Sequence, residues 1–129
     1  MKRFFCVILL APLIATAAPS KKDKEEVSKI VDRSGTILGG LIECDLPQMR
    51  DSYLESLRDA LSAYPGTDPV KVRALIRRVE AQGETISKLG IKSVPSPTAE
   101  DLDQQERLCK SQILDAKRDM RALDQFILK

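Results

Sequence analysis

The sequence contains no histidine, no tryptophan and no asparagine, and these absences exclude several kinds of chemistry. Without histidine, the chain lacks the commonest general base and the commonest zinc ligand. It also has no imidazole to activate a serine or cysteine nucleophile. Without asparagine, it has no acceptor for N-linked glycosylation. No glycine-rich segment carries the signature of a phosphate-binding loop. We therefore expect no catalytic residues, no cofactor and no metal, in a protein that is not an enzyme.

Residues 1–17 have the three-part pattern of a cleaved secretory signal peptide, with a basic start, an apolar stretch and a small-residue end at Ala17. The apolar stretch, residues 4–14, is shorter than the about 20 residues that a membrane span needs. We expect cleavage after Ala17, no stable membrane anchor afterwards, and a single domain over residues 18–129. An uncleaved anchor is the alternative. The short basic leader and the absence of asparagine favour the periplasm of a bacterium.

The mature protein is expected to be close to neutral. Lys2 and Arg3 are the only charged residues of the leader, so cleavage reduces the 21 basic residues to 19, the same number as the acidic residues. A neutral chain has no overall positive field for non-specific binding to nucleic acid. Charged residues of both signs, 31% of the sequence, are instead typical of solvated helix faces. We expect no nucleic-acid partner.

Cys44 and Cys109 remain after cleavage, because Cys6 lies in the leader. An even pair in an oxidising compartment predicts one intramolecular disulfide, and two separately buried thiols are the alternative. The bridge would close a loop of about 65 residues and would stabilise the fold by roughly 4 kcal/mol. We interpret the pair as a structural link and find no pattern that makes it a redox site.

Apolar residues recur at steps of three and four along the mature chain, which predicts an all-α protein without strands. Pro47, the Pro65-Gly66 turn and Pro69 separate the first three helices. Thr98 is suited to capping a long C-terminal helix. Short first and second connections predict a small four-helix bundle of up-down-up-down topology, whose first and last helices are antiparallel neighbours. The expected helices span residues 21–44, 47–64, 69–90 and 98–129.

The cysteines also predict how the first and last helices align. Cys44 closes the first helix, whereas Cys109 lies about three turns into the last one. A bridge between them requires the last helix to overhang the others.

Gly35, Gly39 and Gly83 allow two interpretations. They lie on predicted helical stripes, where a missing side chain would let a neighbouring helix approach closely. Alternatively they interrupt the helices, because an interior glycine costs about 1 kcal/mol relative to alanine.

Basic side chains of the third helix and apolar side chains of the long connection are the candidate contacts with a partner: Arg73, Arg77, Arg78, Ile91 and Val94. A basic helix side can dock an acidic partner or lipid headgroups. The alternative for the arginines is a solvated face that Glu80 and Glu84 balance.

Carboxylates near the start of the last helix are the only candidates for catalysis, and they define a third functional class, a carboxylate-dependent hydrolase. The group consists of Asp101, Asp103 and Glu106. Asp115 and Asp119 form a further pair, four residues apart. We favour the interpretation that these carboxylates complement the helix dipole and pair with basic residues on the helix surface.

In size, leader, predicted helical content and cysteine pair, the chain resembles the periplasmic immunity proteins that neutralise toxins delivered by type VI secretion. This resemblance is one of general type and implies no site residues. It implies an exported, non-enzymatic protein-binding module, such as an inhibitor or immunity protein that neutralises a toxin or hydrolase. The alternative is a small structural or chaperone component of an envelope secretion or conjugation apparatus. The expected partner is another protein, and a homodimer is compatible with the pattern.

Overall fold

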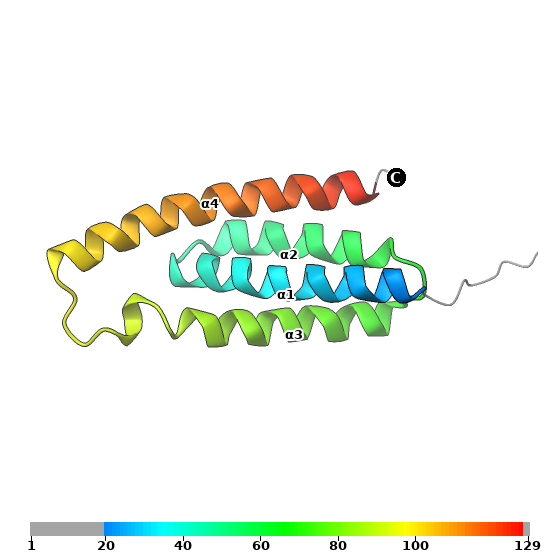
Figure 1. The fold of residues 1–129 in the computed structure, drawn as a ribbon, viewed down its shortest axis with the longest axis horizontal. Helices are drawn as coiled ribbons and strands as arrows, with labels where there is room; N and C mark the ends of the chain where they lie inside the picture. The colour runs from blue at the N-terminus through cyan, green and yellow to red at the C-terminus, as the bar shows by residue number, and fades with distance from the viewer. Residues whose placement is uncertain (1–19, 128–129) are drawn as a thin grey trace, which may run out of the picture.

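The computed structural model describes residues 20–127, and every regular element within them is helical. Figure 1 shows the long helices side by side, with successive helices running in opposite directions. The elements are α1 (Lys21–Glu43), α2 (Pro47–Ser62), α3 (Pro69–Ser87), the short 3-10 helix η1 (Ile91–Ser93) and α4 (Ala99–Ile127). The predicted all-α, up-down-up-down four-helix bundle with a long C-terminal helix is confirmed. The predicted leader lies outside the described residues.

Local sequence signals set where the helices begin. The Asp68 side chain accepts a hydrogen bond from the Lys71 backbone N–H at 2.7 Å, which caps α3. At the start of α4, the Thr98 hydroxyl accepts from the Asp101 N–H at 3.1 Å, and the Asp101 carboxylate accepts from the Thr98 N–H at 2.9 Å. Pro47 occupies the first position of α2, where its missing N–H is not needed. These starts agree with the predicted ones.

Apolar side chains from all four long helices form one core. Helix α2 contributes Tyr53, Leu57 and Leu61, each of which is 0% exposed. Burial of such side chains stabilises the fold by about 1.5 to 3 kcal/mol each relative to exposure. The other buried apolar residues are Ile30, Val31, Ile37, Leu38, Leu41, Ala60, Tyr64, Val72, Ile76, Val79, Ala116 and Leu123.

The glycines are close-packing positions between α1 and α3, which run parallel (Figure 1). A Cβ atom added at Gly39 would lie 2.7 Å from Ile86 Cγ2 and 3.1 Å from the Gly83 carbonyl oxygen. One added at Gly83 would lie 3.1 Å from the Leu38 side chain, and one at Gly35 would overlap Gln82. Because α1 and α3 continue through these positions, the interpretation of the glycines as helix breaks is wrong.

The packing of α1 therefore differs from a regular bundle. The sequence predicts α4 as its neighbour, and α1 does contact α4, but its most extensive contact is with α3. The physical reason is the missing side chains at the α1–α3 interface, which allow the two backbones to approach closely.

The predicted disulfide between Cys44 and Cys109 is present, with a Cα–Cα distance of 5.6 Å. Cys44 is the C-cap of α1, so residues 99–108 extend past the end of α1. At 1.5 Å per residue, this overhang is about 15 Å long. No residue of α4 before Ala116 is fully buried, whereas Gln105, Cys109, Gln112 and Ile113 are half-buried. The disulfide thus fixes the base of a helix that projects beyond the bundle.

Candidate functional site

The three candidate arginines of α3 are all exposed, but they do not face one way. Arg78 lies beside α1, where its Nη2 atom is 3.8 Å from Asp32 Oδ1. By helical spacing, Arg73 and Arg77 lie on the other flank of α3. The sequence therefore predicted a single basic side, whereas the fold divides it between two flanks.

Glu80 and Glu84 do not balance these arginines in the way that the sequence suggests. Within residues 20–127, neither carboxylate forms an ion pair with an arginine of α3. They line a hollow together with Arg50 of α2. The one ion pair that involves an α3 arginine in this part of the chain joins Arg78 to α1.

Of the two candidate residues of the long connection, Ile91 is held against the end of α1 by a hydrogen bond. The Ile91 backbone N–H donates a hydrogen bond to Glu43 Oε1 at 3.0 Å. The Ile91 side chain is half-buried, and that of Val94 is 38% exposed. Arg78 lies nine positions before Ser87, the last residue of α3, which corresponds to about 14 Å along the helix, and Ile91 follows beyond that end. The structure therefore does not bring the arginines and the apolar pair together in one site.

Four exposed apolar side chains belong to the segment that runs from the end of α3 into the first turns of α4, at the end of the bundle that carries the disulfide; Figure 1 shows the backbone of this segment. We call this surface the loop end and define it by Leu89, Val94, Leu102 and Leu108. Leu89 is 76% exposed, Leu102 is 55% exposed and Leu108 is 51% exposed. Large apolar side chains that stay exposed together commonly mark an interaction site. Of these four residues, the sequence analysis named only Val94 as a candidate.

The sequence contains a pattern that could have predicted an exposed apolar residue at the start of α4. Leu102 lies seven residues before Cys109, so it continues the inward stripe of α4. Because Cys109 is bound to the end of α1, α1 does not cover the stripe beyond this point, and the short helix η1 contacts α4 instead. An apolar stripe that outruns its partner helix would have predicted the exposed surface.

A buried polar network joins α1, α2 and α4 near the middle of the bundle. Tyr53 and Ser34 are each 0% exposed, and Asp119 is 7% exposed. The Tyr53 phenol has one proton, which it donates to Asp119 Oδ2; its oxygen accepts from the Ser34 hydroxyl at 2.9 Å. Arg33 Nε donates to Asp119 Oδ1 at 2.7 Å. Each member of the network therefore has a partner.

Burial, and then the neighbouring Asp119 carboxylate, raise the pKa of Tyr53 well above its ordinary value. The phenol stays protonated at any physiological pH, so it serves as a fixed donor and is unsuited to proton transfer. The network aligns three helices. The sequence predicted a surface position for Asp119, and this prediction is wrong, because the carboxylate is buried beside Tyr53 and paired with the half-exposed Arg33.

The carboxylates considered for a hydrolase are engaged on the surface of α4. Asp103 pairs with Arg107 one turn away, and Glu106 pairs with Lys110 at 3.4 Å. Asp101 is part of the helix cap. Within residues 20–127, no group of three histidine, cysteine, aspartate or glutamate side chains has an arrangement that could hold a metal ion. These contacts are those expected of a solvated helix face.

The described helices were also assessed as membrane segments, and none between residues 20 and 127 has both the length and the apolarity of a membrane span. Comparison of the chain with protein-family models, with curated proteins and with solved structures finds no match.

Proposed function

We propose that the chain is an exported, non-enzymatic protein-binding module of the bacterial periplasm. Its role is that of an inhibitor or immunity protein that neutralises a toxin or hydrolase. The observation that carries this proposal is the loop end, an apolar surface at a rigidly supported end of the bundle. The signal-peptide pattern supports export, and the cysteine pair suits an oxidising compartment.

Rigid support favours tight binding, because a surface that is already ordered loses little conformational entropy when it binds. Two links hold the loop end in place. The disulfide joins α4 to the end of α1, and the hydrogen bond from Ile91 to Glu43 joins η1 to the same end. The loop end thus meets a partner as a preformed surface.

The overhang indicates the chemistry of the partner. Acidic residues outnumber basic ones within residues 99–108, so the segment is net negative: Glu100, Asp101, Asp103 and Glu106 against Arg107. Opposite charges around an apolar centre steer association and fix orientation. We expect the partner to present an apolar patch with a basic rim.

Affinity capture with the full chain in the periplasm of its own host tests this proposal. Leu89→Glu and Leu102→Glu place charges in the loop end, and Leu114→Glu is the matched control. Leu114 is 62% exposed, and helical spacing places it on the outer side of α4. We expect one protein to be retained by the wild type and by the Leu114 variant, and to be lost with the other two.

The captured protein then distinguishes inhibition from other kinds of binding. An inhibitor should abolish the enzymatic or toxic activity of its purified partner at a one-to-one ratio, and it should protect cells that express that partner. Unchanged activity at this ratio, or equal capture by the loop-end variants, would contradict the proposal.

The overhang itself favours a second candidate, a structural or chaperone component of an envelope secretion or conjugation apparatus. A helix that projects about 15 Å beyond its bundle is suited to joining an assembly. In that case the captured proteins should be subunits of envelope machinery, and truncation of the overhang should release them without relieving any inhibition.

A further inference from the structure

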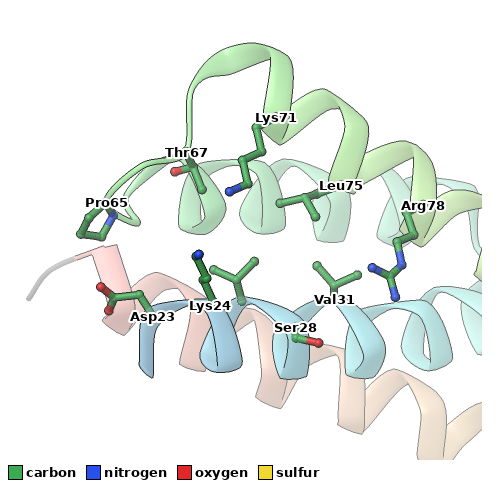
Figure 2. Close-up of a pocket in the computed structure, with 10 residues that line it drawn as sticks. Asp23, Lys24, Ser28, Val31, Pro65, Thr67, Lys71, Leu75 and Arg78 are labelled. Carbon is green, nitrogen blue, oxygen red and sulfur yellow. The ribbon is translucent and has the colours of Figure 1, made fainter. Parts of the chain in front are cut away.

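A hollow lies between the N-terminal halves of α1 and α3 (Figure 2). Its volume is about 200 Å³. The two helices are drawn together at the glycines, whereas α1 has no glycine between Lys21 and Ser34. Side chains therefore separate the helices here, and Pro65 and Thr67 of the α2–α3 connection border one end.

The base of the hollow is apolar. Val27 and Val31 of α1 and Leu75 of α3 line it. Val27 and Leu75 remain half-buried because they face this space, while Val31 reaches into the core and is 1% exposed. An apolar cavity of about 150 Å³ in another protein holds a benzene molecule. This base is therefore large enough for an apolar group of that size.

The rim of the hollow is cationic. Figure 2 shows Lys24 pointing from α1 toward α3 and Lys71 pointing from α3 toward α1, into the same space. Within residues 20–127, neither lysine forms an ion pair. Arg78 borders the other end, and its 3.8 Å contact with Asp32 is too long for a hydrogen bond. Three cationic side chains therefore retain donors for a ligand.

Two other polar groups around the hollow already have hydrogen-bond partners. Asp23, its only lining carboxylate, accepts a hydrogen bond from the Ser20 backbone N–H at 3.1 Å in the capping box of α1. The Thr67 hydroxyl bonds to the carbonyl oxygens of Leu61 and Tyr64. The lining as a whole is positive, so it favours an anion.

We propose that this hollow binds a small amphipathic carboxylate, whose apolar group rests on Val27, Val31 and Leu75 while its carboxylate meets Lys24, Lys71 and Arg78. Each half of the ligand is required for a physical reason. A hydrated inorganic anion gains nothing from the apolar base. A neutral hydrocarbon leaves the repulsion between the converging ammonium groups in place.

Calorimetric titration of the full chain with 3-phenylpropionate tests the proposal. The matched ligands are 3-phenylpropanol, which lacks the charge, and acetate, which lacks the ring. We expect saturable binding of phenylpropionate that is at least about tenfold tighter than that of either control. Amide NMR shifts should map to the residues around Val27, Val31 and Leu75. No saturable binding, equal binding of the alcohol, or shifts confined to other regions would overturn the proposal.

Charge variants test the role of the rim. Lys24→Gln with Lys71→Gln should weaken phenylpropionate binding about tenfold and leave phenylpropanol binding unchanged, since one ion pair of roughly 1.4 kcal/mol corresponds to a factor of ten. Lys92→Gln with Lys117→Gln removes two exposed lysines elsewhere and should change neither affinity. All four side chains are exposed, so the variants should fold, and unchanged thermal unfolding confirms this. Equal weakening by both double variants would refute a specific role of the rim.

The same chemistry is available from a free acid or from the C-terminal residue of a peptide. Acetyl-Ala-Phe with a free carboxylate distinguishes these sources when it is compared with phenylpropionate. Tighter binding of the peptide assigns the hollow to a protein C-terminus, and tighter binding of phenylpropionate assigns it to a small molecule. Capture of a partner through the loop end is measured separately, so either proposal can fail alone.

Discussion

The Tyr53→Phe substitution should be the most destabilising change that alters only a single oxygen atom in this protein. It removes the donor to Asp119 and the acceptor of the Ser34 hydroxyl, and both partners stay buried. A hydrogen bond to a charged group contributes about 1.5 to 3 kcal/mol, and an unsatisfied buried hydroxyl adds a penalty of about 1 kcal/mol or more. Because phenylalanine has nearly the same shape, no cavity forms.

We therefore expect Tyr53→Phe to lower the free energy of unfolding by about 3 kcal/mol. For a domain of this size, that loss corresponds to a fall in Tm of about 10 °C. Urea or thermal unfolding followed by circular dichroism measures both quantities. Tyr64→Phe is the matched control: its hydroxyl lies 3.4 Å from Glu26 Oε2, a weak hydrogen bond, and its loss should cost less than about 1 kcal/mol.

A double-mutant cycle shows whether the network acts as a unit. Asp119→Leu should lower the free energy of unfolding by about 2 to 3 kcal/mol, because it leaves the Tyr53 phenol buried without an acceptor. Loss of the ion pair with Arg33 should add little, because that side chain is 48% exposed and can be solvated by water. Replacing both partners by apolar side chains removes the stranded phenol donor, and only the Ser34 hydroxyl is left without its partner. The double variant should therefore be more stable than the sum of the single losses by about 2 kcal/mol. Additive losses, or a loss below about 1 kcal/mol for Tyr53→Phe, would refute the network as described.

Three further predictions concern packing, the disulfide and alkaline pH. Gly39→Ala should lower the free energy of unfolding by about 1 to 3 kcal/mol, because the added Cβ atom would overlap the Ile86 side chain. Gly40→Ala should cost less, because its Cβ atom would contact only the flexible side chain of Gln112. Thermal unfolding of the two variants measures the difference. Replacing Cys44 and Cys109 by serine should cost roughly 4 kcal/mol in denaturant unfolding, and non-reducing mass measurement of the wild type should show two hydrogens fewer than the reduced chain. Burial, with Glu26 nearby, raises the pKa of Tyr64 to about 12, and the pKa of Tyr53 is raised further from 10.0. Because the pKa of each tyrosine is higher in the folded state, its contribution to stability is fully present below pH 10 and is lost as the pH rises above 10. For Tyr53 alone the free energy of unfolding should fall by about 1.4 kcal/mol per pH unit. Tyr53→Phe should reduce this slope, and an unchanged slope would contradict the raised pKa of Tyr53.

Helix boundaries could be predicted from the sequence because they depend on residues within a few positions of each helix end. The cysteine pair could be predicted because only one pairing remains once the leader is removed. Pro47 suits the first turn of a helix, and Asp68 and Thr98 cap helices through hydrogen bonds to residues three positions away. Cys44 and Cys109 are the two cysteines outside the predicted leader, so one pairing was available. The overhang of α4 then followed from their positions.

Contacts between distant segments could not be predicted, because a residue pattern does not say which helix will face it. Gly35, Gly39 and Gly83 had two interpretations until α3 was seen to pack against α1. Asp119 fits a helix surface when α4 is considered alone, and its burial depends on Tyr53, which lies 66 residues away.

The same distinction holds for the candidate sites. The sequence by itself determined an all-α protein with defined helix ends and one disulfide, since hydrophobic period, caps and cysteine count act over a few residues or by exclusion. Only the tertiary structure decided that Arg78 turns toward α1, that the loop end stays uncovered, and that Lys24 meets Lys71 above an apolar hollow. Each of these depends on the angle and separation of helices that are far apart in the chain, and close packing at the glycines brings α1 and α3 together.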